Sequence, residues 1–182
     1  MFTKDSQHQK QLVKITSAVL DAFHFDVGDM AETNKNPKED TENESLSKEE
    51  VQKKKIFWTV NNVLLPKLNG TLSGKTKGAN NISDEDKLIL RVPLAIPIVK
   101  MLKILSAKAL HRQVPGIINK IISFLKSKAI EIREAARSTL CSVMELLGPR
   151  YLGFVIKEMS SNLQRGYHLH ILTFTSHSLM CK

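Results

Sequence analysis

The histidines and the second cysteine near the carboxyl end are the residues whose types could bind a metal ion. His168, His170, His177 and Cys181 lie close together in the sequence, and imidazole and thiolate are ligands that zinc prefers. On a helix, His177 and Cys181 share a face because they are four residues apart, but His168 and His170 point apart. The pattern therefore predicts no metal site and no cofactor.

Two further segments resemble catalytic motifs only in part. The sequence GTLSGKT at Gly70–Thr76 is one residue shorter between its glycines than a phosphate-binding loop and follows no predicted strand. Cys141 lies inside an apolar stripe without a histidine nearby, so a nucleophilic role is not favoured. Both cysteines have apolar neighbours, which predicts small buried thiols. We expect a protein that is not an enzyme and takes no small-molecule substrate.

The formal net charge of +9 is concentrated in the second half of the chain. Residues 1–83 contain 12 Lys/Arg and 11 Asp/Glu, whereas residues 84–182 contain 15 and 7, a balance of +8. Such an excess could form a diffuse surface for RNA phosphates or acidic partners, although lysines often only solvate helix faces. The candidates for this surface are Lys120, Lys126, Lys128, Arg137, Arg150, Lys157 and Arg165.

The hydrophobic pattern divides the chain into five segments. Residues 1–25 are predicted to form an amphipathic helix, 26–50 a disordered polar linker, 51–67 a second helix ended by Pro66, and 68–83 a flexible loop. Residues 84–182 should form helical repeats. The first twenty residues carry four charges, so they resemble neither a signal peptide nor a membrane span, and no membrane association is expected.

Apolar stripes at helical spacing run through residues 84–182. We expect Pro93 and Pro97 to break one helix, Pro115 to open the next, and Gly148-Pro149 to separate two more. Residues 167–182 favour a helix, with a strand as the alternative. The stripe residues are Ile117, Ile118, Ile121, Ile122, Phe124 and Leu125; Ile132, Ala136, Leu140, Val143 and Leu147; and Leu152, Val155, Ile156, Met159 and Leu163.

Short turns between these helices predict antiparallel pairs that need neighbouring pairs to cover them. The sequence LKSKAIEIREAARSTLCSVMELL at Leu125–Leu147 resembles the second half of a HEAT unit. Arg133 matches the arginine of that pattern, and Ser127 stands where the family usually has Asp. The resemblance implies an all-α, HEAT/armadillo-like α-solenoid of antiparallel helix pairs with disordered polar linkers. Ser127 and Arg133 would then register the repeats, with an RNA phosphate contact as the alternative for Arg133.

A closer resemblance covers about half the chain. The stretch from Arg112 to Tyr167, together with VPLAIPIVKML at Val92–Leu102 and ILTFTSHSL near the end, is similar to the C-terminal part of the large HEAT-repeat component 20 of the small-subunit processome, the down-regulated in metastasis family. The resemblance implies a fragment or short isoform of a non-catalytic scaffold in the nucleus and nucleolus.

The partners implied by this resemblance are ribosome-assembly proteins, the U3 small nucleolar ribonucleoprotein and pre-rRNA bound without sequence specificity, in processing of pre-18S rRNA. The alternative is a HEAT-repeat adaptor of the transport or phosphatase scaffold type, which binds proteins without RNA contact.

Overall fold

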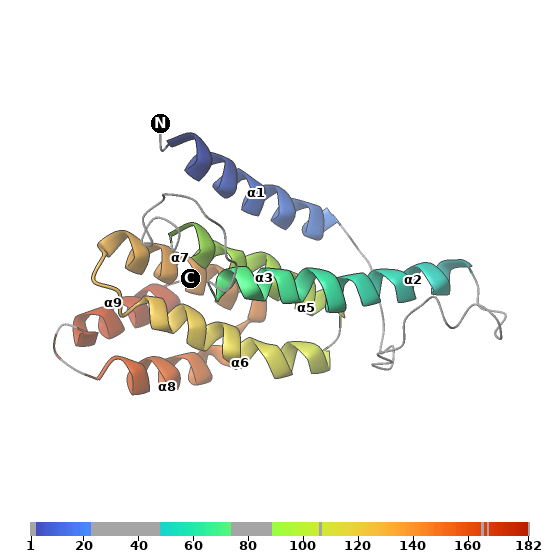
Figure 1. Ribbon diagram of the computed structural model, residues 1–182. Coiled ribbons are helices and arrows are strands. Elements are labelled where there is room, and N and C mark those ends of the chain that lie inside the picture. Colours follow the sequence, from blue (N-terminus) through green and yellow to red (C-terminus); the bar gives the residue numbers. More distant parts are fainter. Residues whose placement is uncertain are drawn as a thin grey trace.

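The computed structural model describes residues 3–22, 48–73, 89–105, 107–164, 166 and 168–181, and its regular elements are helices (Figure 1). No β-strand occurs within these residues, so the all-α prediction is confirmed. The elements in chain order are α1 (Thr3–Ala22), α2 (Lys48–Thr59), the π-helix η1 (Val60–Leu64), α3 (Leu65–Leu72), the 3-10 helix η2 (Val92–Leu94), α5 (Ala95–Leu105), α6 (Ala107–Phe124), α7 (Ile130–Leu147), the 3-10 helix η3 (Pro149–Tyr151), α8 (Leu152–Asn162) and α9 (His168–Met180).

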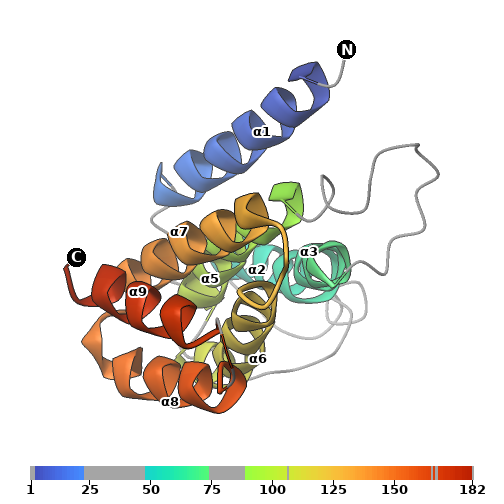
Figure 2. The same ribbon diagram turned by 90° about the vertical axis from the view of Figure 1, so that its left-hand side faces the viewer.

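The helices from α5 to α9 form two layers because each buries an apolar stripe against its neighbours. α5, α7 and α9 pack side by side in one layer, and α6 packs beside α8 in the other (Figure 2). Along the chain, each helix of one layer is followed by a helix of the other. α1 packs on α5, and α3 packs on α5 and η2.

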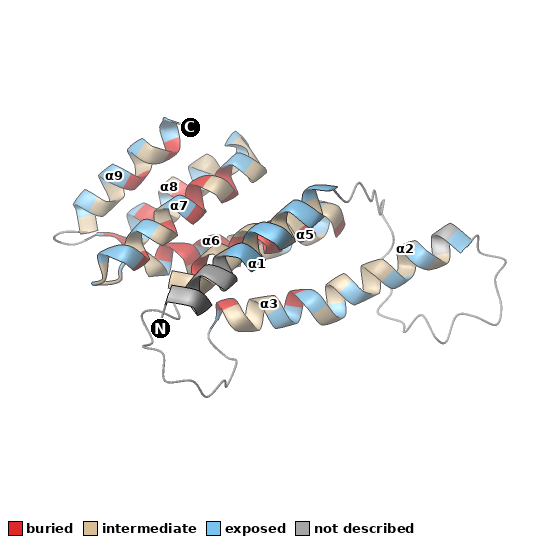
Figure 3. Ribbon diagram, turned by 90° about the horizontal axis from the view of Figure 1, so that it is seen from above, coloured by how far each residue is buried: buried red, intermediate tan, exposed pale blue. Residues whose placement is uncertain are grey.

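The core is aliphatic and lies between these layers. Each of the three predicted stripes contributes fully buried residues, among them Ile121, Leu140 and Met159, all 0% exposed. Figure 3 shows that buried positions gather on α5 to α8, whereas the described side chains of α1, residues 11–22, include none that is buried. Leu12, Ile15 and Val19 of α1 are exposed, and the half-buried Leu20 packs against the core.

The prolines explain where some helices break and where others do not. Pro93 lies in η2 and α5 begins directly afterwards at Ala95, so the predicted break is confirmed at Pro93. At Pro97 the prediction is wrong, because Pro97 lies in the first turn of α5, which continues to Leu105, and a proline in a first turn costs no backbone bond. The prediction that Pro115 opens a helix is wrong: α6 begins at Ala107 and contains Pro115. The turns before Pro115 carry the fully buried Val114 and the half-buried Leu110, and their packing offsets the lost backbone bond.

The other corrections concern helix ends. α3 continues to Leu72, so Pro66 and Gly70 do not end the helix and residues 68–72 are not a loop. Pro66 lies in the first turn of α3, after the π-helix η1, where a proline needs no backbone partner. α2 begins at Lys48, within the predicted linker. The remainder of the two predicted linkers, residues 26–47 and 74–83, lies outside the described residues.

Gly148 separates α7 from η3 with φ of +78°, which confirms that a glycine conformation ends this helix. The helix prediction for the carboxyl end is also confirmed, since His168–Met180 form α9. Among the described helices, no single one is long and apolar enough to cross a membrane; Ile130–Leu147 and Pro149–Asn162 meet that test of length and composition only as a pair bent by 118°.

A candidate basic surface

The turn between α6 and α7 brings together several of the predicted residues. The Arg133 guanidinium, on the first turn of α7, reaches back to this turn, and its Nη1 donates hydrogen bonds to the backbone oxygens of Ser127, at 2.9 Å, and Lys128, at 2.7 Å. The Ser127 Oγ accepts from the Ala129 amide at 3.3 Å. Ser127 therefore bonds within the turn, while the N-cap position of α7 is Ala129, which forms no side-chain cap bond.

Two lysines flank this turn on the exposed surface. Lys126 donates to the Asn162 side-chain oxygen at 3.0 Å, which joins the turn to the carboxyl end of α8. Lys128 is exposed. Lys120, one turn before the end of α6, is half-buried, and its ammonium lies 5.8 Å from the centroid of the Phe124 ring. These three cations thus occupy the end of the molecule where α6 and α8 finish.

Arg137 makes contacts within the protein. Its guanidinium lies 2.6 Å from the Glu134 carboxylate and 4.3 Å from the centroid of the Phe174 ring on α9. The contact with an aromatic face is a cation–π interaction. Arg137, Glu134 and Phe174 line a groove of about 270 Å³ between α7 and α9, together with Arg133 and His170. Arg137 therefore helps to join two helices of one layer.

The remaining candidates lie elsewhere. Arg150 is exposed in η3, beyond the far end of α7, and the 18 residues of α7 span about 27 Å. Lys157 is exposed on α8, between the two ends. Arg165 lies outside the described residues. The described candidates therefore do not form one cluster, and the cations near Ser127 are separated from Arg150 by the length of a helix.

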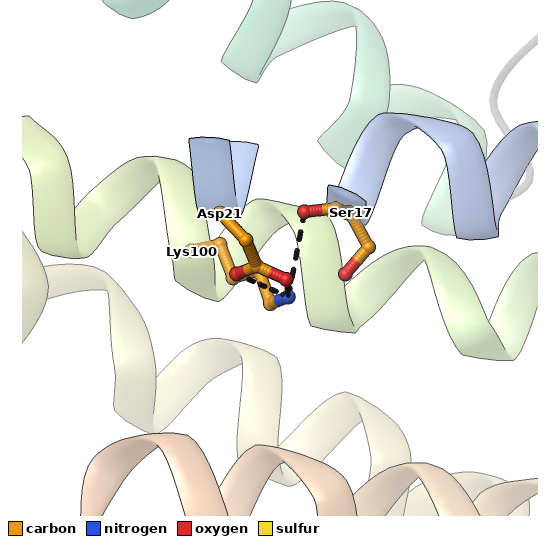
Figure 4. Close-up of polar contacts among 3 residues, drawn as sticks. All are labelled: Ser17, Asp21 and Lys100. Atoms are coloured by element: carbon orange, nitrogen blue, oxygen red, sulfur yellow. Dashed lines mark hydrogen bonds and ion pairs between the residues drawn. The ribbon is translucent and has the colours of Figure 1, made fainter. Parts of the chain in front are cut away.

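Sequence reasoning did not single out several polar contacts that join the helices. Lys100 of α5 lies 2.6 Å from both carboxylate oxygens of Asp21 and donates to the Ser17 backbone oxygen at 3.5 Å, which ties α1 to α5 (Figure 4). Lys103 donates to the Leu146 backbone oxygen at 2.9 Å, near the carboxyl end of α7. Positive charge is favourable at a helix carboxyl end. The sequence does not indicate which carbonyl the lysine binds, because Leu146 is 43 residues away.

An aromatic contact joins the amino half of α6 to η3. The hydroxyl of Tyr151 lies 2.6 Å from Nδ1 of His111, and the two rings stack with centroids 5.8 Å apart. Neither residue belongs to an apolar stripe that would have indicated the contact. The pair fixes the start of α8 relative to α6.

The residues weighed as metal ligands do not gather into a site. His177 and Cys181 lie on one face of α9, with Sγ 3.5 Å from Nε2. Among the described residues, no three His, Cys, Asp or Glu side chains are arranged to hold a metal ion. Cys141 is buried as expected, but Cys181 is exposed, so the burial prediction is wrong for Cys181. Its position directly after the last residue of α9 explains this exposure.

The fold and these contacts define an all-helical protein whose helix layers are joined by polar contacts and whose surface carries an excess of cations. Residues 82–182 match the family described as the U3 small nucleolar RNA-associated protein 20 domain. The matched region is more than half of the chain and contains both helix layers from η2 to α9. The chain therefore belongs to this family.

Two curated relatives carry the same name. The U3 small nucleolar RNA-associated protein 20 of Schizosaccharomyces pombe is 33% identical over 100 residues, which cover 55% of this chain. The protein of that name from Saccharomyces cerevisiae is 36% identical over 97 residues, or 53% of the chain. Each match covers only 4% of the relative's length.

Proposed function

We propose that this chain is a segment of a HEAT/armadillo-like α-solenoid and acts as a non-catalytic scaffold in the small-subunit processome. The alternation of helices between two layers from α5 to α9 supports a solenoid, because stacked helix pairs produce such contacts between every second helix. The match of residues 82–182 to the U3-associated family carries the functional part of the proposal.

The partners in this proposal are ribosome-assembly proteins, the U3 ribonucleoprotein and pre-rRNA, in the nucleolus. The relatives' names state association with U3 small nucleolar RNA. The net excess of cations after residue 83 favours a polyanionic partner, because phosphate contacts by Lys and Arg release counterions. Lys126, Lys128 and Lys157 are the predicted candidates that lie exposed on α8 and the turn before α7.

Arg133 and Ser127 have a structural role in this proposal. The Arg133 Nη1 bonds two carbonyls of the α6–α7 turn, and its registration role is therefore to hold α6 and α7 at a fixed angle. This role uses the guanidinium for the protein itself rather than for RNA.

Co-purification from cells tests the function. A tagged 182-residue chain would be expressed in cells that contain its processome, and U3 RNA would be quantified in the purified fraction. We expect enrichment of U3 RNA and ribosome-assembly proteins, and a loss of part of that enrichment when Lys126, Lys128 and Lys157 are changed to Gln. Recovery of transport receptors or phosphatase subunits without U3 RNA would replace the scaffold proposal with the adaptor alternative.

A further inference from the structure

A polar groove between α3 and α6 shares only Lys120 with the surface discussed so far. It has a volume of about 320 Å³, and α3 and α6 come from segments separated by more than thirty residues. Its described lining residues include two cations, Arg112 and Lys120, and no acidic side chain. The full lining is Asn69, Leu72, Ser73, Arg112, Gln113, Gly116, Ile117 and Lys120.

The elements that form this groove contain no carboxylate at all. Residues 51–73 and 107–124 include no Asp or Glu. Arg112 is exposed, and among the described residues no hydrogen bond or ion pair engages its guanidinium. Arg112 and Lys120 are eight residues apart on α6, which corresponds to about 12 Å along the helix axis. Their charges therefore favour an extended anion over a compact one.

The lining of the groove exposes little apolar surface. Its two large apolar residues, Leu72 and Ile117, are only 3% and 5% exposed, so they offer no anchor for the apolar side chains on which protein interfaces depend. Gly116 lies between the two cations, and a Cβ built there would meet nothing within 4 Å. None of the described lining residues is aromatic, so these residues offer bases no stacking platform.

We propose that the α3–α6 groove binds the sugar-phosphate backbone of RNA, with Arg112 and Lys120 each contacting a different phosphate. The choice of RNA as the polyanion rests on the proposed function. Asn69, Gln113 and Ser73 supply neutral donors of the kind that position a backbone. Recognition at this groove is independent of base sequence.

Fluorescence anisotropy with a labelled 12-nucleotide oligouridylate and the purified 182-residue chain tests the groove. Gly116→Glu places a carboxylate four residues from both Arg112 and Lys120, where it can pair with either cation. Leu12→Glu is the control, since Leu12 is 61% exposed on α1 and no Lys or Arg lies three or four residues from it. Circular dichroism and thermal melting check that both variants fold.

We expect Gly116→Glu to weaken RNA binding on the order of fivefold or more, and Leu12→Glu to weaken it less than twofold. The double variant Arg112→Gln, Lys120→Gln should make the negative slope of log affinity against log salt shallower by about 1.4. Each lost phosphate contact on a single strand accounts for about 0.7. This second variant also serves if Gly116→Glu fails to fold.

Three results would overturn the groove proposal. Equal weakening by Gly116→Glu and Leu12→Glu would indicate diffuse binding, and an unchanged salt slope in the double variant would contradict the two phosphate contacts. Tighter binding of a polyglutamate peptide than of RNA, abolished by Gly116→Glu, would assign the groove to an acidic protein. None of these results affects U3 co-purification, so the groove can fail while the proposed function holds, and the reverse is equally visible.

Discussion

Removing the Arg133 fork should destabilise the protein without changing its contact with RNA. In Arg133→Met, an unbranched apolar side chain replaces the aliphatic stem of the arginine, and both hydrogen bonds to the turn carbonyls are lost. A bond to a charged group contributes about 1.5–3 kcal/mol when buried, and Arg133 is only half-buried. We therefore take a value below this range, about 1 kcal/mol per bond, and expect the free energy of unfolding to fall by about 2 kcal/mol.

Urea unfolding followed by circular dichroism measures this loss, with an unchanged dependence on urea as a check that the folded and unfolded states stay comparable. In a thermal melt, the same loss corresponds to about 4–8 °C for a chain of this size. Arg133→Lys keeps the charge, but its ammonium lies one atom closer to the backbone than Nη1, which makes both bonds, so about half the loss is expected. The control is Lys128→Met, whose exposed side chain should contribute less than about 0.5 kcal/mol.

The reasoning is refuted if Arg133→Met and Lys128→Met unfold at the same urea concentration. The structural role of Arg133 is also refuted if Arg133→Lys retains full stability while Arg133→Met loses RNA affinity. Charge alone would then explain the role of Arg133. A register role requires stability, and not affinity, to follow the shape of the guanidinium.

Replacing either of two glycines by alanine should change stability in opposite directions, as measured by urea unfolding. Gly116→Ala, inside α6 with open space at its Cβ, should raise the free energy of unfolding by about 0.5–1 kcal/mol. Gly148→Ala, at φ +78°, should lower it by about 1–3 kcal/mol. Leu140→Ala, in the core, should cost about 2–5 kcal/mol, while Leu12→Ala, 61% exposed, should cost less than about 0.5 kcal/mol; equal losses would mean that α1 is part of the core. RNA affinity measured from low to moderate salt should fall with a log-log slope of about −3.5, if Arg112, Lys120, Lys126, Lys128 and Lys157 each hold one phosphate, and a flat response would contradict this.

The helices of the core could be predicted from sequence because their periodicity reports burial directly. Ile121, Leu140 and Met159 recur at helical spacing and are all fully buried. Signals from single residues were less reliable. Pro115 and Pro66 both suggested a boundary, yet tertiary packing of Val114 and Leu72 keeps the chain helical on both sides. A proline removes one backbone bond, whereas each buried aliphatic side chain contributes a comparable free energy.

The polar contacts could not be predicted in the same way, because each depends on two segments that only the fold brings together. Lys103 and Leu146, for example, are 43 residues apart, and Lys126 and Asn162 are 36 apart. The Arg133 contact is the exception: its partners lie five and six residues away, and a local motif can encode such a distance. No pattern in the sequence indicated a role for Arg112, because its groove forms only when α3 packs against the rest of the protein.

This distinction limits how formal charge can be used to estimate RNA binding. The balance of +8 after residue 83 counts every cation equally, and eight phosphate contacts on a single strand would give a salt slope of about −5.6. However, Arg133, Arg137 and Lys103 are already bound to turn carbonyls, a carboxylate and a helix end. Each would have to give up its internal contact before it could bind phosphate. Without these three cations five contacts remain, so a slope near −3.5 is expected if the fold keeps the internal contacts. A slope near −5.6 would mean that RNA binding takes them apart.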